Sequence, residues 1–256
     1  MALAIGFCAL CSSAFAATWF VWSDAAGRQH FTHDQPTLGV PYTQVSLPDD
    51  IRWYGAPEMP AEIAADSSRT SAPNIFKLAS QSVYWISRRS SAGTANAPAV
   101  VYGSAVAISE DLALTNCHVI AGAGEDAVIG SANSAERAPA IVVAANIEAD
   151  RCVVRARNLQ LKPVAGLRRF DTLEVGETVY AIGNPRRLEL TMSEGLLSGK
   201  RVTGDLRLLQ MTAPISPGSS GGGLFDSRGN LAGITSSSLV GAQNINFAIP
   251  AEDYWN

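Results

Sequence analysis

The feature that most constrains the fold is a series of short apolar runs separated by turn residues. The runs are five to nine residues long, are rich in Val, Ile and Thr, and are bounded by Gly, Pro, Asn and Ser, which is typical of strands. They lie at 82–86, 100–108, 111–115, 140–147, 152–156, 178–183, 207–211 and 231–237. Their regular spacing, with few helical stretches between them, predicts an all-β barrel or sandwich.

The glycine-rich heptapeptide PGSSGGG, residues 217–223, is the strongest chemical signal in the chain. A serine hydroxyl is a weak nucleophile, so acyl transfer needs a neighbouring base and N–H donors aimed at the oxyanion. Gly218, Gly221 and Gly222 allow positive φ and close approach, so the N–H groups of Gly218 and Ser220 can converge on one point. Taken alone, such a run more often marks a flexible surface turn.

The histidine that could serve Ser220 is His118. The chain has three histidines, and His30 and His33 lie near the N-terminus. His118 follows an apolar strand-like run in LALTNCHVI, where rigid sheet would support a base that faces a cleft. The alternative is a lone histidine that caps a strand.

Asp150 is the candidate carboxylate that would orient the imidazole. It opens the sequence DRCVV, in which an apolar strand begins immediately after the acid. Asp126, Asp171 and Asp205 are alternatives, but each lies in a turn or loop segment and is interpreted as a solvated turn acid.

These motifs together resemble a known family. The order His118, Asp150, Ser220 and the segments GSAVAI, TNCHV, DRCVV, YAIGNP, SPGSSGGGLFD and NFAIP, between Ser82 and Pro250, are similar to the trypsin-like serine proteases of the bacterial HtrA/Deg branch. The resemblance implies a chymotrypsin-like double six-stranded β-barrel with the active site between the barrels. It implies that Ser220 is the nucleophile, His118 the general base and acid and Asp150 its orienting partner, with an oxyanion hole formed by the N–H groups of Gly218 and Ser220.

The sequence departs from the family at two positions of the turn. Gly223 stands where the family usually has proline, and Ser219 stands where asparagine or aspartate is commoner. Because only six residues follow Pro250, no PDZ domain is expected after the protease region.

The resemblance also predicts the primary specificity pocket. The family places the base of this pocket six residues before the nucleophile, where this chain has Pro214, and its walls would include Ile234, Thr235, Ser236 and Phe247. Without a carboxylate, a buried substrate Lys or Arg would be an unpaired charge. Cleavage after small or medium aliphatic residues is therefore expected.

Cys117 and Cys152 are predicted to form a disulfide. They lie one residue before His118 and two after Asp150, so a working triad brings their backbones close together, and an exported protein is oxidised. The alternative is a pair of buried free thiols. No His/Cys spacing indicates zinc, and neither a metal nor a cofactor is expected.

The N-terminal part of the chain predicts export. Residues 1–16 include a short apolar segment that ends in Ala-Phe-Ala, which is typical of a secretory signal, so a periplasmic or secreted protein without a membrane anchor is expected. Residues 17–48 predict a small hairpin module and also resemble a short domain of unknown function in exported bacterial proteins. Residues 49–73 predict a Pro/Ala/Ser-rich linker, and residues 74–256 form the predicted protease domain.

Composition excludes some partners. The formal net charge is −4 and the pI is about 5.4, which gives no electrostatic footprint for nucleic acid, and no basic helix indicates membrane binding. The arginine pairs at 88–89, 168–169 and 186–187 are interpreted as solvated loop charges. Two classes of function remain: a serine endopeptidase acting on proteins or peptides, and a pseudo-protease that serves as a binding module in the cell envelope.

Overall fold

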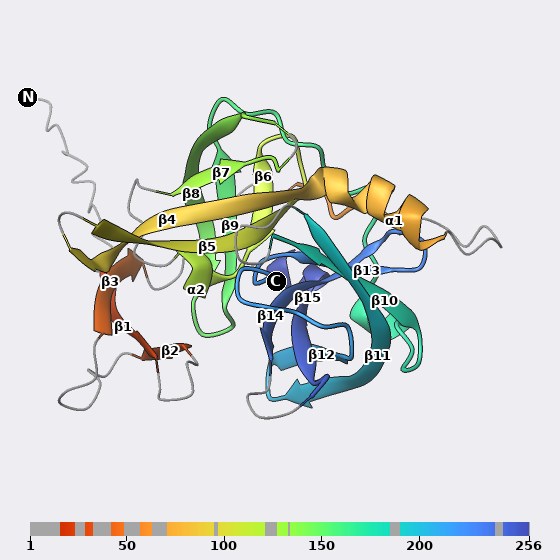
Figure 1. The fold of residues 1–256 in the computed structure, drawn as a ribbon. Helices are drawn as coiled ribbons and strands as arrows, with labels where there is room; N and C mark the ends of the chain where they lie inside the picture. The colour runs from red at the N-terminus through yellow and green to blue at the C-terminus, as the bar shows by residue number, and fades with distance from the viewer. Residues whose placement is uncertain are drawn as a thin grey trace, which may run out of the picture.

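The protein is built from two closed six-stranded β-barrels and a separate three-stranded sheet (Figure 1). The computed structural model describes residues 16–23, 29–32, 42–48, 57–62, 71–94, 97–120, 127–132, 134–184, 190–238 and 243–255. This architecture confirms the predicted all-β double barrel. Residues 1–15, which hold most of the predicted signal segment, lie outside the described part of the chain.

The N-terminal barrel has the strand order β4-β5-β6-β9-β8-β7. Its strands are β4 (Val83–Thr94), β5 (Ala97–Ala107), β6 (Leu112–Thr115), β7 (Val128–Gly130), β8 (Arg137–Asn146) and β9 (Arg151–Ala156). Alternate residues point into the barrel, as the two-residue period of a strand requires. Tyr84 and Ile86 therefore join the barrel interior. Val83, on the opposite face of β4, joins a second core, which lies between the barrels.

The C-terminal barrel has the strand order β10-β11-β12-β15-β14-β13. Its strands are β10 (Thr178–Gly183), β11 (Thr191–Thr203), β12 (Leu206–Met211), β13 (Gly223–Asp226), β14 (Leu231–Ser238) and β15 (Asn246–Pro250). Leu197, Leu209 and Met211 fill its interior. Leu114 from one barrel and Phe225 from the other are completely buried in the core between them, so the two barrels pack as one unit.

Short helices precede, connect and follow the strands of the barrels. They are the α-helices α1 (Ala72–Ala79) and α2 (Cys117–Ile120) and the 3-10 helices η1 (Ser80–Ser82), η2 (Phe170–Thr172) and η4 (Ala251–Trp255). Pro73 lies in the first turn of α1, where a proline costs no helix hydrogen bond. The last two residues of the predicted 49–73 linker are thus helical, and Ile75 of the same helix is fully buried.

The N-terminal module has one strand more than the predicted hairpin. β1 (Ala16–Ser23) lies between β2 (Gln29–Thr32) and β3 (Tyr42–Pro48), and both neighbours are antiparallel to it. β1 and β2 pair as an antiparallel hairpin, in which Ser23 lies opposite Gln29. The third strand was not predicted for residues 17–48.

Part of the predicted linker contacts the protease region. Within residues 57–62, the carbonyl of Pro57 accepts a hydrogen bond from Trp255 Nε1 at 2.8 Å. Met59 packs against the core between the barrels. Glu62 forms ion pairs with Arg168 and Arg228, each at 3.4 Å.

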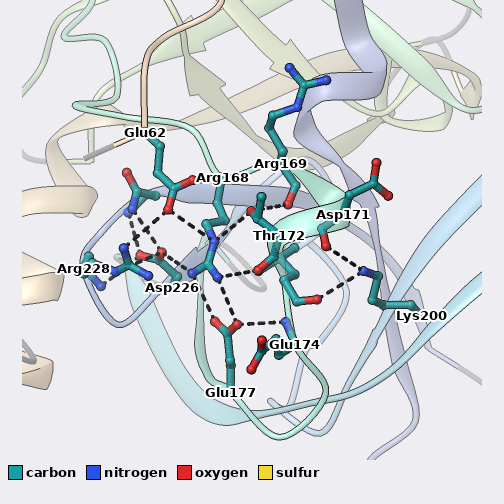
Figure 2. Close-up of polar contacts among 12 residues, drawn as sticks. Glu62, Arg168, Arg169, Asp171, Thr172, Glu174, Glu177, Lys200, Asp226 and Arg228 are labelled. Atoms are coloured by element: carbon teal, nitrogen blue, oxygen red, sulfur yellow. Dashed lines mark hydrogen bonds and ion pairs between the residues drawn. The ribbon is translucent and has the colours of Figure 1, made fainter. Parts of the chain in front are cut away.

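Arg168 is the centre of a largely buried cluster of charges (Figure 2). Its guanidinium bonds to Glu177 at 3.0 Å and to Asp226 at 3.2 Å. Burial acts to lower the pKa of Arg168, but Glu177, Asp226 and Glu62 outweigh it, so the pKa lies above its ordinary value. The ion pair with Asp226 holds the segment that connects the barrels against β13. The interpretation of Arg168 as a solvated loop charge was wrong, because its side chain is only 8% exposed.

Candidate active site

His118 and Asp150 face each other across the end of the N-terminal barrel. His118 lies in α2, directly after β6, and Asp150 lies in the turn that leads into β9. The imidazole Nδ1 is 2.7 Å from Asp150 Oδ2, and the backbone N–H of His118 donates to Asp150 Oδ1 at 2.9 Å. Their side chains are 21% and 22% exposed, so the pair is accessible to a substrate yet shielded from bulk water.

The turn at Asp150 is held by the residues that precede the histidine. Asp150 has a φ of 56°, a left-handed conformation that Asp tolerates better than most residues. Its carbonyl accepts hydrogen bonds from Cys117 N and Asn116 Nδ2, both at 3.3 Å. Asn116 was not predicted as a site residue, although its position between the end of a strand and the histidine could have indicated such a role.

Two charges oppose each other at His118. Burial lowers the pKa of the imidazole, but the charge of Asp150 and its hydrogen bond outweigh burial, so the pKa is raised above 6.5. The charge of Arg88 acts in the lowering direction. Arg88 lies on β4, is 4% exposed and donates from Nε to Val119 O at 3.0 Å, so its interpretation as a solvated charge was also wrong.

The pH dependence of activity tests this balance. A general base must be neutral, so activity should fall as the pH drops through the raised pKa of His118. Replacing Arg88 with Met removes a cation that lowers this pKa, and the acidic limb of kcat/KM should move to higher pH. Arg88→Lys, which keeps the charge, should leave the limb near its wild-type position. A limb that stays in place or moves to lower pH in Arg88→Met would contradict this account.

Ser220 lies in a turn whose glycines are required by space and by backbone geometry. Gly218 and Gly221 have φ values of 97° and 85°. A Cβ on Gly221 would stand 1.9 Å from the carbonyl oxygen of Ser104. Gly222, which was expected to use positive φ, does not, but a Cβ there would come within 2.5 Å of Ile182 O.

The turn leaves two backbone donors without acceptors. Ser219 N bonds to Ser216 O and Gly222 N to Ser219 O, each at 2.8 Å. The N–H groups of Gly218 and Ser220 have no hydrogen-bond acceptor among the described residues. Two unpaired donors beside a serine hydroxyl are the arrangement that an oxyanion requires.

Ser236 links the serine to the acid. Ser220 Oγ donates to Ser236 O at 2.9 Å, and Ser236 Oγ donates to Asp150 Oδ2 at 3.2 Å. Among the described residues, Ser220 Oγ has no hydrogen bond to the imidazole of His118. Rotation about the Cα–Cβ bond of Ser220 redirects its hydroxyl, and such contacts are often long before substrate binds.

Ser104 on β5 braces the turn from the opposite barrel. Its N–H donates to Ser220 O at 2.8 Å, and its Oγ donates to Gly218 O at 2.9 Å. The same Oγ accepts from Asn184 N at 2.9 Å. Ser104 was not predicted as a site residue, because its role depends on a contact between the two barrels.

The predicted pocket residues occupy different places. A cavity of about 180 Å³ beside the turn is lined by Pro214 and Thr235, together with Ala181, Ile182, Gly183, Thr191, Ser193, Ile215, Ser216 and Ser219. Ile234, Ser236 and Phe247, which were also predicted as walls, do not line this cavity, and Ile234 is fully buried in the core between the barrels. No carboxylate is among the lining residues, and Asp226 is bound to Arg168 instead.

Cys117 and Cys152 are joined by a disulfide with a Cα–Cα distance of 4.9 Å. The bond links α2 to β9 and so ties together the two segments that carry His118 and Asp150.

We expect mass spectrometry of the unreduced, alkylated protein to find both cysteines unmodified, because each is held within bonding distance of the other. Alkylation after reduction and unfolding is the control, and it should modify both residues. Two alkylated thiols in the unreduced sample would overturn the pairing.

No group of three or more His, Cys, Asp and Glu residues in the described part of the chain could hold a metal ion. In that part, no helix has the length and apolar character needed to cross a membrane.

The sequence and the fold of this chain are similar to those of known proteases. Residues 103–234 match the family described as Trypsin-like peptidase domain. The chain is 32% identical over 167 residues to "Putative serine protease HhoB" of Synechocystis sp., covering 60% of this chain and 38% of that protein. It is 35% identical over 164 residues to "Serine endoprotease DegS" of Haemophilus influenzae, covering 59% of this chain and 47% of that protein. It thus spans less than half the length of these relatives.

A solved structure described as "HtrA-type protease AlgW with tripeptide" has a TM-score of 0.63 and 31% sequence identity, and the match covers 72% of this chain and 61% of that one. The family match extends over more than half of the 256 residues. The chain therefore belongs to the trypsin-like peptidase family and has the double-barrel fold of the HtrA-type proteases.

Proposed function

We propose that the protein is a serine endopeptidase that hydrolyses peptide bonds through a triad of His118, Asp150 and Ser220. The observation that carries the proposal is the chain of contacts from His118 through Asp150 and Ser236 to Ser220, next to two backbone N–H groups that have no acceptor among the described residues. The triad order and the similarity to proteins named serine proteases support it.

The proposed reaction has two halves. Ser220 Oγ attacks the scissile carbonyl while His118 Nε2 takes its proton, and Asp150 stabilises the resulting imidazolium. The N–H groups of Gly218 and Ser220 hold the oxyanion. His118 then gives its proton to the leaving amine, and water, activated by the same imidazole, hydrolyses the acyl-enzyme.

A pseudo-protease that binds partners in the cell envelope is the alternative. A pure binding module has no chemical need for an oriented imidazole, a partly exposed serine hydroxyl and two backbone donors without a described acceptor, all in one place. Incubation of the wild-type protein with a fluorophosphonate probe separates the two functions, because the probe reacts only when nucleophile, base and oxyanion hole act together. Stoichiometric labelling of Ser220 supports the protease, and an unlabelled, folded protein supports the binding module.

We further propose that the enzyme is exported and acts on protein or peptide substrates in the periplasm or outside the cell. The apolar N-terminal segment supports export. Relatives named "Probable periplasmic serine endoprotease DegP-like", such as that of Pseudomonas putida at 33% identity over 172 residues, support the same location.

Cleavage should follow small or medium aliphatic residues such as Ala, Val, Ile or Leu. Pro214 and its neighbours Ala213 and Ile215 carry no charge, and no carboxylate lines the adjacent cavity. A buried Lys or Arg would therefore lose its hydration without gaining a partner. Mass-spectrometric mapping of cleavage sites in an unfolded protein measures the preference, with the Ser220→Ala protein as the control for contaminating proteases. Predominant cleavage after Lys or Arg would refute it.

A further inference from the structure

A large groove lies on the outer face of the N-terminal barrel, beside the candidate active site. Its volume is about 710 Å³, within the range of ligand-binding clefts. Its floor crosses the neighbouring strands β5, β4, β7 and β8. Tyr102, Ser87, Val128 and Pro139 oppose one another in a row across these strands, and all four line the groove. Residues that oppose one another on paired strands point to the same face.

A second row gives the groove an aromatic surface and a charged end. Trp85, Gly130 and Arg137 oppose one another on β4, β7 and β8. A Cβ on Gly130 would lie 2.3 Å from the indole, so the glycine lets Trp85 lie flat across the sheet. Trp85 Nε1 donates to Ser131 O at 3.1 Å, which fixes the ring.

The near end of the groove touches the catalytic turn. Gly103 lines the groove, and a Cβ there would stand 2.5 Å from Val119, the neighbour of His118, and 3.0 Å from Ser220 O. Asn184 lines the same end, and its backbone N–H is bound to the Ser104 hydroxyl that supports Gly218. A ligand in the groove thus begins next to the nucleophile.

Two hydrogen-bond donors of the groove have no acceptor in the described part of the chain. Asn184 is 4% exposed, and its buried Nδ2 is unpaired. Arg137 is exposed at the far end, and its guanidinium forms no ion pair with any described carboxylate. A buried amide without a partner is costly, so the groove fits a ligand that supplies acceptors.

The position of His118 indicates which part of a substrate would reach the groove. His118 protonates the leaving amine, so the chain that follows the scissile bond departs on the side of the N-terminal barrel. From β5 to β8 the groove crosses three strand spacings, about 14 Å, which is the length of about four extended residues. Arg137 would therefore lie near the side chain of the fourth substrate residue after the scissile bond.

Resting on the proposed function, we propose that this groove binds the part of a peptide substrate that follows the scissile bond, and that Arg137 selects an acidic side chain about four residues after it. The buried amide of Asn184 pairs with the backbone of the first residues, and Trp85 packs against the middle ones. The occupant is a peptide chain rather than a small molecule, because the donors lie at opposite ends of an open, extended floor.

Two sets of substrates test the inference. One is a series of internally quenched peptides with the same sequence before the scissile bond and Glu or Lys at the third, fourth or fifth residue after it. The other is an anilide with the same acyl part and no residue after the bond. The wild-type enzyme should cleave the best Glu peptide about fivefold faster in kcat/KM than its Lys counterpart at low salt, and less so at high salt.

Arg137→Glu should reverse the preference between Glu and Lys peptides, whereas Arg137→Lys should retain it. Arg201→Glu, the same charge change at an exposed strand position of the C-terminal barrel, is the matched control and should leave the preference unchanged. The anilide should be hydrolysed equally by all these variants.

The groove proposal would be overturned if Arg137→Glu left the ratio of kcat/KM for Glu and Lys peptides unchanged, or if it lowered the activity on peptides and on the anilide equally. The proposed protease function would survive either result, because fluorophosphonate labelling and anilide hydrolysis by the wild type would still support it. A wild-type protein that is neither labelled nor active on the anilide would overturn the proposed function, and the groove proposal with it.

Discussion

Replacing Ser220 with Ala is expected to abolish fluorophosphonate labelling and to reduce peptide hydrolysis by a factor on the order of 10⁴ or more. Among the described residues the hydroxyl donates to Ser236 O alone, and Ser220 is partly exposed, so the loss of the hydroxyl removes the nucleophile without opening a cavity. The fold should survive, and an unchanged thermal unfolding curve would show this. Labelling of the intact protein, followed by peptide mapping, identifies the modified serine.

The neighbouring serine is the matched control. Ser219 is buried, and its Oγ accepts from Ser216 N at 3.3 Å, so Ser219→Ala should weaken the turn without removing the chemistry. His118→Ala should resemble Ser220→Ala, and Asp150→Asn should lower activity in the same direction by favouring the wrong imidazole tautomer. Full activity in Ser220→Ala with loss in Ser219→Ala would show that the nucleophile is assigned to the wrong residue.

Replacing Asp226 with Ala is expected to lower the free energy of unfolding by about 3 to 5 kcal/mol. Asp226 is completely buried, and besides Arg168 its carboxylate accepts the N–H groups of Arg228 and Asn230 at 2.8 and 2.9 Å. Its removal takes away the acceptor that these donors share and deprives a buried guanidinium of one anion (Figure 2). For a protein of this size, the melting temperature should fall by at least about 6 °C.

Two variants separate this mechanism from a general loss of packing. Asp205→Ala changes an exposed hairpin acid and should leave the melting temperature nearly unchanged. In the double variant Arg168→Met, Asp226→Ala, the total loss should be smaller than the sum of the two single losses, because neither partner is left buried alone. Strict additivity, or a single Asp226→Ala variant as stable as Asp205→Ala, would contradict the coupling.

The parts of the fold that were predictable from the sequence are those that short, local residue patterns determine. Short apolar runs between turn signals predicted eight of the twelve barrel strands. Family-like motifs singled out His118, Asp150 and Ser220, which hydrogen bonds through Ser236 connect in the structure. The disulfide partners followed from their positions beside His118 and Asp150, and the structure joins them.

The contacts that sequence reasoning missed are those made between distant segments. The Ser104 hydroxyl binds the turn at Gly218 from 114 residues away, and Ser236 binds Ser220 through a backbone carbonyl, which no side-chain pattern encodes. Arg88 and Arg168 were misjudged because adjacent arginines are usually solvated, whereas here the carbonyl of Val119 and three carboxylates stabilise them in buried positions. The pair at 186–187 lies outside the described residues.

The 3-10 helix η4 bears on how the site forms as the chain is synthesised. Tyr254 donates its hydroxyl to Thr115 O at 3.1 Å, at the end of the strand that leads to His118, across 139 residues of sequence. Asp253 binds Arg151, next to Asp150, and Arg207 of the other barrel. A nascent chain that has completed every strand but not residues 251–255 still lacks these braces behind the histidine. Because contacts of such long sequence separation are slow to form, we expect the support behind His118 and Asp150 to be complete only when η4 docks.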